Sequence, residues 1–320
     1  MESLLHIACF ALINIALIGA GYAVVKHAMV ALSWLLLVIT ITTVHFIFLG
    51  DPPVLRMLAI IATTFTAMKL IAVAEAYKGK KFALTFKQWA IFASSWAGMR
   101  AQPFETLGGP PLPNAWPMVR FGISRIFIGA LFIAVANGVQ ALHLAENLSY
   151  MLISGLLLVG FSLILHFGLL SISAGMWRRH GANAYLLFRQ PARALSLTEF
   201  WSKRWNIAFS EMTSVTIFRP LKNRIGAPAA LMLAFAFSGL LHELALSLPV
   251  NAGYGLPMLY FIIQGLLVLF EKWLSINNIR FLQSKLIAHA WVFFGLVVPM
   301  PLLFHTQFIK QVVWVMGGIH

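Results

Sequence analysis

Long apolar runs recur along the whole chain and are separated by shorter polar segments. The runs and the residues that interrupt them predict eight membrane spans, at about 4–25, 28–49, 54–74, 119–141, 150–174, 227–248, 255–276 and 284–304. A helix needs about 20 apolar residues to cross a hydrocarbon core of about 30 Å, and each run reaches that length. No part of the chain reads as a separate soluble domain. The pattern therefore predicts one all-α domain over residues 1–320, a polytopic transmembrane helix bundle.

Positive charges test this count, because lysine and arginine accumulate in cytoplasmic loops. They gather after the first, third, fifth and seventh predicted spans, and the loop between spans five and six holds the most. The intervening loops contain Asp51, then Glu146, then no charge around residues 251–254. This alternation predicts that both ends of the chain lie outside. It favours the cytoplasmic membrane, or the endoplasmic reticulum in a eukaryote.

Two predicted cytoplasmic connections are too long to be simple turns. The segment 75–118 contains an apolar and aromatic run at 82–96, which predicts a helix lying at the membrane surface, followed by a proline-rich stretch. The segment 175–226 mixes tryptophan, phenylalanine and arginine at a density typical of the headgroup region. Both segments are expected to face the cytoplasm.

Composition supports a membrane protein and excludes several other classes. The chain is 60% hydrophobic and only 10% charged. Its formal charge of +14 comes from bases placed between spans, which argues against nucleic acid and favours contact with anionic membrane lipids. The single cysteine, Cys9, excludes an internal disulfide, and no cluster of histidines or carboxylates has ligand spacing, so we expect no metal. The absence of an internal repeat argues against a secondary transporter built from two related halves.

Ionisable residues inside a span are costly and are functional candidates by default. His242 and Glu243 lie slightly past the middle of the sixth predicted span. Neighbours on a helix point about 100° apart, so the two side chains must have separate roles. Ser238 and Gly239 share the face of the histidine and predict a groove for a long thin substrate. A neutral imidazole suits proton acceptance from an alcohol, although a histidine that only hydrogen-bonds a neighbouring helix is an equal alternative.

A second candidate group is the run from Phe200 to Asn206, Phe-Trp-Ser-Lys-Arg-Trp-Asn. Lys203 and Arg204 are predicted to bind phosphate oxygens, while Trp201 and Trp205 seat the run at the interface. The Asn206 amide can orient a carbonyl or a leaving group. The alternative reading is that aromatic and basic side chains merely anchor this loop to the membrane.

Other polar residues within the spans have weaker interpretations. His166 in the fifth span is a secondary candidate for substrate binding. Lys69 and Arg125 lie near cytoplasmic ends, from which their side chains are expected to reach the headgroups. Gln264 in the seventh span is expected to hydrogen-bond a neighbouring helix.

Together, the two motifs resemble the membrane-bound O-acyltransferase family, in which a buried histidine follows an aromatic motif ending in Trp-Asn by roughly 35 residues. The stretch from Ser238 to Glu243 looks like the His-Glu variant of wax synthases and of diacylglycerol or sterol acyltransferases. Phe200, Trp205 and Asn206 match the F-Y-x-D-W-W-N motif of the diacylglycerol enzymes. Lys203 and Arg204 depart from that motif, but a run Phe-Trp-x-x-Arg-Trp-Asn itself resembles wax synthase-like sequences. Glu211-Met and Phe218 to Leu221 extend the resemblance, which covers about residues 95–305.

The resemblance implies a fatty acyl transfer from acyl-coenzyme A to a lipid hydroxyl. It assigns His242 as the catalytic residue and Asn206 as its partner, with Glu243, Ser238 and Trp205 in support. The expected substrate-binding residues are Phe200, Trp201, Lys203, Arg204 and His166. A long-chain alcohol, giving a wax ester as in a long-chain-alcohol O-fatty-acyltransferase, is the favoured acceptor. A sterol, a glycerolipid or an exported polymer is the alternative, as is a lipid transporter without enzymatic activity. No cofactor is expected besides acyl-coenzyme A as co-substrate, and the sequence leaves open whether the chain forms a homo-oligomer.

Overall fold

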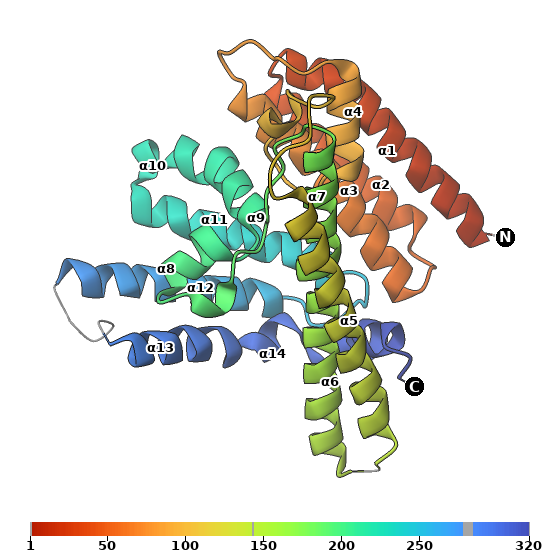
Figure 1. Cartoon of the computed structure of the whole chain (residues 1–320), viewed down its shortest axis with the longest axis vertical. Helices are drawn as coiled ribbons and strands as arrows, with labels where there is room; N and C mark the ends of the chain where they lie inside the picture. The colour runs from red at the N-terminus through yellow and green to blue at the C-terminus, as the bar shows by residue number, and fades with distance from the viewer. Residues whose placement is uncertain (1, 143, 278–283, 320) are drawn as a thin grey trace.

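The computed structural model describes residues 2–142, 144–277 and 284–319, and every regular element in these ranges is a helix (Figure 1). Within them, eight helical stretches are long and apolar enough to cross a membrane, as the sequence predicted. They are α1 (Glu2–Lys26), α2 (Val30–Ile47), α3 (Pro53–Ala76), α5 (Ala115–Gln140), α6 to α7 (Glu146–Arg179), α11 with η6 (Ala227–Ser247), α12 (Leu256–Ile276) and α13 with α14 (Lys285–Leu303). The chain is thus an integral, multi-pass membrane protein.

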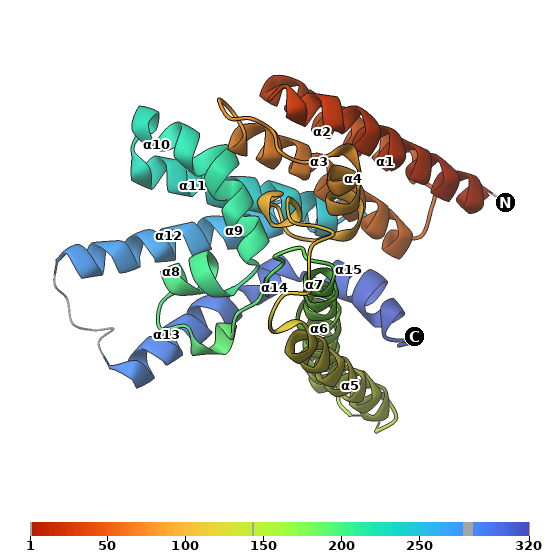
Figure 2. The same cartoon turned by 45° about the horizontal axis from the view of Figure 1, so that its top comes forward.

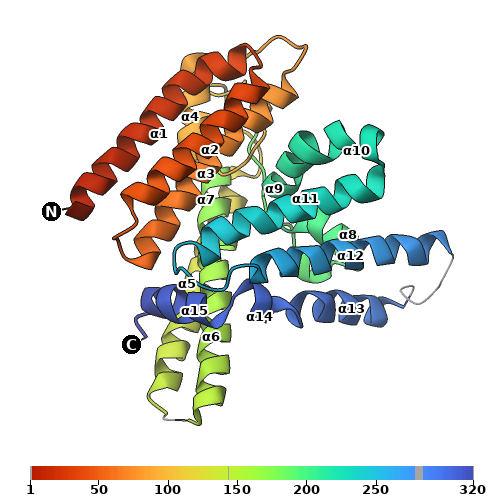
Figure 3. The ribbon, with the colours of Figure 1, turned by 180° about the vertical axis from the view of Figure 1, so that it is seen from behind.

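The spans form three groups joined by shorter helices. Helices α1, α2 and α3 pack side by side, α5 pairs with the continuous helix α6 to α7, and α11 packs on α12 beside α13. Figures 1 and 2 show α9 (Ile207–Thr213) between α11 and α7, and α4 (Phe86–Ser95) beside α1. Both chain ends lie on one side of the bundle in Figure 3, as an even number of spans requires. The shorter elements are α4 (Phe86–Ser95), η1 (Gln102–Phe104), η3 (Pro191–Arg193), α8 (Leu197–Glu199), η4 (Phe200–Arg204), α9 (Ile207–Thr213), η5 (Ser214–Phe218), α10 (Arg219–Ile225), α15 (Thr306–Phe308) and η8 (Ile309–Trp314).

Several short stretches are π-helical rather than α-helical. The fifth span runs through α6 (Glu146–Ser162), a π-helical segment η2 (Leu163–Leu169) and α7 (Leu170–Arg179), so it is longer than the predicted 150–174. Segment η4 and segment η6 (Glu243–Ser247) are π-helical as well. Such segments often occur at functional sites, and these three contain or adjoin the candidate residues.

The helix predicted within residues 82–96 is present as α4, and its position at the membrane surface stays a prediction. Thr85 precedes it, and the Thr85 hydroxyl accepts a hydrogen bond from the Gln88 backbone N–H while the Gln88 side chain accepts one from the Thr85 backbone. This reciprocal cap satisfies two of the N–H groups that a helix start leaves without partners. The cap explains why the helix begins at this point within the predicted range.

Lys69 differs from its prediction. Its side chain does not reach the headgroups but is 3% exposed inside α3, the most deeply buried of the eight spans. The ammonium donates hydrogen bonds to the backbone carbonyls of Phe92, Ala93 and Trp96, the first two at 3.0 and 2.8 Å. These carbonyls end helix α4, and a positive charge there is favourable because the C-terminal end of a helix dipole is negative. The lysine therefore fastens the end of α4 to the third span.

Glycines let α5 and the α6–α7 helix approach at backbone distance. A side-chain carbon added at Gly122 would lie 2.6 Å from the Gly168 carbonyl oxygen, and one added at Gly129 would lie 2.6 Å from that of Gly160. Between membrane helices the hydrophobic effect gives little association energy, so close packing of small residues takes its place. The spacing of these glycines along both helices makes the pair a tightly packed hairpin.

Candidate active site

His242 is the last residue of α11 and precedes the π-helical segment η6. It lies about three quarters of the way along the sixth span. Its ring Nδ1 is 2.7 Å from the Ser238 backbone carbonyl oxygen. A carbonyl oxygen only accepts, so Nδ1 must carry the proton of the neutral ring and donate it. The lone pair is then on Nε2, which makes this atom the proton acceptor of the ring.

Two aromatic rings from different helices border the imidazole. The Phe261 ring on α12 has its centre 4.3 Å from that of His242, and the Phe209 ring on α9 has its centre 6.1 Å away. The histidine is therefore positioned by three helices at once.

The predicted groove beside His242 is not present at Gly239. A side-chain carbon added at Gly239 would lie 2.8 Å from the Met258 sulfur, so Met258 of α12 fills this space. Ser238 is buried, and its hydroxyl donates to the Ala234 carbonyl oxygen at 2.9 Å. The prediction of a groove on this face was wrong, because the small residues serve close packing between α11 and α12. Ser238 supports His242 through its backbone carbonyl.

Glu243 has a separate role from His242, as the angle between them required. Its Oε1 atom accepts hydrogen bonds from the backbone N–H groups of Gly255 and Met258, both at 3.0 Å. These groups belong to the start of α12, which a negative charge stabilises. Because α12 also carries Phe261, the carboxylate holds in place the helix whose ring packs on His242.

Asn206 is the N-cap of the short helix α9. Its backbone has a positive φ of 40°, a conformation that asparagine tolerates better than most residues, and its side-chain oxygen accepts from the Phe209 N–H at 3.3 Å. The cap uses the oxygen of the amide, so the NH₂ group is the end able to donate to a substrate. Asn206 and His242 are linked through Phe209, which belongs to the helix that the asparagine caps and contacts the imidazole.

The aromatic residues of the run connect the two motifs. Trp201 donates from its indole nitrogen to the Gln264 side-chain oxygen at 3.2 Å, and its ring centre is 5.8 Å from that of Phe261. Gln264 also donates to the Gly295 carbonyl oxygen on α13 at 2.8 Å, which confirms the predicted interhelical bond.

Trp205 packs on the other side of the run. Its ring stacks on Phe200, with centres 5.5 Å apart and planes 13° apart. The ring of His166, from segment η2, lies 5.5 Å from Trp205 and 4.7 Å from Phe188, and its Nδ1 is 3.1 Å from the Ser162 hydroxyl. The structure thus places His166 beside the aromatic motif.

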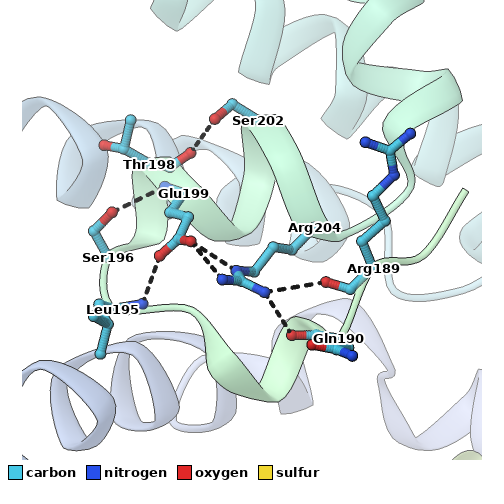
Figure 4. Close-up of polar contacts among 8 residues, drawn as sticks. All are labelled: Arg189, Gln190, Leu195, Ser196, Thr198, Glu199, Ser202 and Arg204. Carbon is cyan, nitrogen blue, oxygen red and sulfur yellow. Dashed lines mark hydrogen bonds and ion pairs between the residues drawn. The ribbon is translucent and has the colours of Figure 1, made fainter. Parts of the chain in front are cut away.

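Arg204 is held by protein groups, as Figure 4 shows. Its guanidinium donates to Glu199 at 2.7 and 2.8 Å and to the backbone oxygens of Arg189 and Gln190 at 3.3 and 3.2 Å. The backbone N–H of Leu195 and then Arg204 hold the pKa of the Glu199 carboxyl below its usual value. Arg204 therefore braces the loop rather than offering a free fork to phosphate, whereas Lys203 is exposed.

Glu271 of α12 was not predicted from the sequence, and it is only 6% exposed. Its carboxylate accepts from the backbone N–H groups of Leu197 and Thr198 at 2.6 and 2.9 Å, from the Thr198 hydroxyl at 2.9 Å and from the Trp291 indole at 2.8 Å. These contacts fix the start of α8, from which the Phe200–Asn206 run follows. An acidic residue within an apolar run was the available signal, but its neighbour Lys272 made the pair resemble the polar end of a span.

A cavity of about 900 Å³ lies between the C-terminal end of α3, the loop before α5, and helices α9 and α10. Its lining includes the bases Lys78, Lys80, Arg100, Arg219 and Arg224 and the acids Glu75 and Glu211. Glu211 is partly neutralised, since it accepts from Arg100 at 3.4 Å and from the Tyr185 hydroxyl. Burial and this carboxylate raise the pKa of Tyr185. The cavity is thus a net positive recess among segments predicted to be cytoplasmic.

Comparison with known proteins agrees with the motif assignment. Residues 185–263 match the model of the membrane bound O-acyl transferase family. A long-chain-alcohol O-fatty-acyltransferase of Simmondsia chinensis is 34% identical over 71 residues, which are 20% of this chain and 20% of that protein. The probable long-chain-alcohol O-fatty-acyltransferase 1 of Arabidopsis thaliana is 39% identical over 72 residues, which are 20% of this chain and 21% of that protein. The probable long-chain-alcohol O-fatty-acyltransferase 6 of the same plant is 26% identical over 141 residues, which are 42% of this chain and 39% of that protein.

The matched segments span about a fifth of the first two relatives and about two fifths of the third. The family match contains both candidate motifs, from Phe200 to Asn206 and from Ser238 to Glu243. The predicted resemblance to the membrane-bound O-acyltransferase family is thereby confirmed over residues 185–263.

Proposed function

We propose that this protein transfers a fatty acyl group from acyl-coenzyme A to the hydroxyl of a long-chain alcohol, forming a wax ester. One observation carries the proposal. Helix α9 contributes Ser210, Glu211 and Met212 to the wall of the basic cavity and Phe209 to the surroundings of His242. A single short helix therefore links a recess suited to phosphates with the intramembrane base.

His242 acts as the general base. The hydroxyl of the acceptor donates to Nε2, and as the proton moves to this atom the alcohol oxygen attacks the thioester carbonyl carbon. The new carbon–oxygen bond forms first, and the carbon–sulfur bond then breaks, with the electron pair leaving on sulfur. The proton on Nε2 passes to that sulfur, which releases coenzyme A as a thiol and restores the neutral histidine. The hydrogen bond from Nδ1 to Ser238 holds the ring in the required tautomer throughout.

Asn206 is proposed to stabilise the thioester oxygen. Its NH₂ group can donate to the negative charge that develops on this oxygen when the alcohol attacks. The cap bond to Phe209 fixes the orientation of the amide in advance, so little reorganisation is needed during the reaction.

The acyl donor is proposed to bind with its phosphates in the basic cavity. The cavity is lined by five bases and two acids, and one of the acids, Glu211, is paired with Arg100. The excess positive charge attracts the several negative charges of coenzyme A. Lys203 adds an exposed positive charge to the loop that contributes Ser202 to the same cavity. The apolar chain would extend into the helix bundle, beside Phe200, Trp201 and His166.

Acyl transfer by the purified protein in detergent tests the proposal, with radiolabelled palmitoyl-coenzyme A and a panel of long-chain alcohol, diacylglycerol and sterol. His242→Ala should lower ester formation by about 10²–10⁴-fold, the usual contribution of a general base. His289→Ala is the matched control, because His289 also places Nδ1 2.7 Å from the carbonyl oxygen four residues earlier, that of Lys285. Equal activity of the two variants would reject His242 as the base. A product formed only with sterol or diacylglycerol would replace the proposed acceptor, and no transfer by a folded wild type would reject the enzymatic function.

A further inference from the structure

A second cavity, of about 670 Å³, lies apart from the proposed donor recess, between α4, the loop 107–109 and the end of α7. Its lining contains three basic side chains, Lys87 on α4, and Arg179 and His180 at the end of α7. None of the described residues that line it is an aspartate or a glutamate. All three bases are exposed, so the positive charge of the cavity is accessible to an outside ligand.

The other lining side chains are mainly apolar. Ile91, Leu107, Met176 and Trp177 form a wall beside the bases. Trp177 is fixed by a hydrogen bond from its indole nitrogen to the Ser95 carbonyl oxygen at 3.3 Å, which ties α7 to the end of α4. The cavity therefore combines a cationic rim with an apolar wall, which suits a ligand with a phosphate head and hydrocarbon tails.

Exposed aromatic residues place the cavity at the level of the lipid headgroups. Phe86 at the start of α4 is 53% exposed and Trp116 at the start of α5 is 50% exposed. The Arg179 guanidinium lies 4.5 Å from the centre of the Trp116 ring, which holds the cation at the membrane surface. Tryptophan is enriched at the membrane interface, and interfacial helices combine basic residues with exposed tryptophan or phenylalanine. The ligand is therefore expected to arrive from the bilayer rather than from the water phase.

We propose that this cavity, between α4 and the end of α7, binds the phosphate headgroup of an anionic phospholipid. Lys87, Arg179 and His180 contact the phosphate, and the first part of the acyl chains lies along Ile91 and Met176. The proposal does not depend on the acyltransferase assignment, since it rests on a different cavity and on different residues.

Native mass spectrometry of the full-length protein, titrated in detergent with phosphatidylglycerol or phosphatidylcholine, tests the site. The double variant Lys87→Gln/Arg179→Gln should bind phosphatidylglycerol about thirtyfold more weakly than wild type, because each interfacial base contributes a factor of about five. The control Lys272→Gln/Lys285→Gln removes two exposed bases at the ends of α12 and α13 and should leave binding unchanged. Equal binding of both lipids by wild type, or equal loss in both double variants, would overturn the proposal.

A photoactivatable phosphatidylglycerol keeps the proposal testable if the double variant does not fold. In wild type it should label peptides from residues 85–91 and 176–180, and free coenzyme A should not reduce this labelling. Labelling elsewhere would overturn the site. Displacement by coenzyme A would overturn the lipid as ligand, because the cavity would then be part of the donor site.

Discussion

Replacing Glu271 by glutamine changes few atoms, yet we expect it to be among the most damaging substitutions in this protein. All four groups around the carboxylate are donors: two backbone N–H groups, a hydroxyl and an indole N–H. A carboxylate can accept from all of them, whereas a glutamine amide has one accepting oxygen and an NH₂ group that only donates.

The size of the effect follows from this geometry. If the NH₂ group takes the Oε1 position, it faces the Leu197 N–H and the Trp291 indole. If it takes the Oε2 position, the Thr198 hydroxyl can rotate to accept, but the Thr198 N–H still loses its acceptor. A buried donor without a partner costs about 1–3 kcal/mol, and the remaining bonds lose their charge assistance, so Glu271→Gln should destabilise the protein by about 2–4 kcal/mol.

Two measurements on purified protein in detergent check this prediction. Thermal unfolding followed by size-exclusion chromatography should show a lower midpoint for Glu271→Gln, and acyl transfer should fall at least about tenfold, because α8 no longer fixes the run that ends at Asn206. Glu146→Gln is the matched control, since Glu146 is an exposed acid at the first position of α6. If Glu271→Gln were as stable and active as Glu146→Gln, the reasoning about the four donors would be refuted.

Substitutions at three further positions have outcomes that follow from the structure. Glu243→Gln keeps an oxygen for the start of α12 and should change turnover by no more than about fivefold. Glu243→Ala removes that oxygen and loosens Phe261 against His242, so it should lower both turnover and thermal stability. Equal turnover in wild type and both variants would reject a positioning role for Glu243. Gly129→Leu should prevent α5 from packing against α6, because the added side-chain carbon would lie 2.6 Å from the Gly160 carbonyl oxygen. Size-exclusion chromatography should show a loss of folded protein. A normal yield of folded protein would refute the prediction. The pKa of Glu199 is lowered, so its carboxylate stabilises the fold at a pH above the usual pKa of 4.5, and this stabilisation is lost as the pH falls through the lowered pKa. Glu199→Gln should therefore lose less thermal stability than wild type on acidification. Parallel pH profiles of the two proteins would contradict this prediction.

The spans and helix α4 could be predicted because they depend on local sequence. An apolar run of sufficient length has few alternatives in a membrane, and the start of α4 is encoded by Thr85 and Gln88, three residues apart. His242 and Glu243 were predicted as separate functional groups because charge within a span is costly at any position.

Partners distant in sequence could not be predicted. Arg204 was expected to bind phosphate, yet Glu199 and two carbonyls occupy its donors, and only the folded loop brings the oxygens of residues 189 and 190 to it. Gly239 was expected to border a groove, but Met258 from the next helix fills the space. In both cases the sequence pointed to a residue with a particular role, but the group that the residue contacts depends on how the chain folds around it.

The position of Lys69 has a consequence for how the protein is made. Its carbonyl acceptors follow it by 23 to 27 residues in the chain, in α4. At about 5–20 residues per second, a ribosome needs on the order of one to five seconds to synthesise that stretch. During this interval α3 would enter the bilayer with an unpaired lysine, and such a charge costs about 2.5–3.5 kcal/mol at the centre of a span and less toward the end, where Lys69 lies. Stable insertion of the third span is therefore expected to await the emergence of α4, which would make these two helices a single unit of biosynthesis.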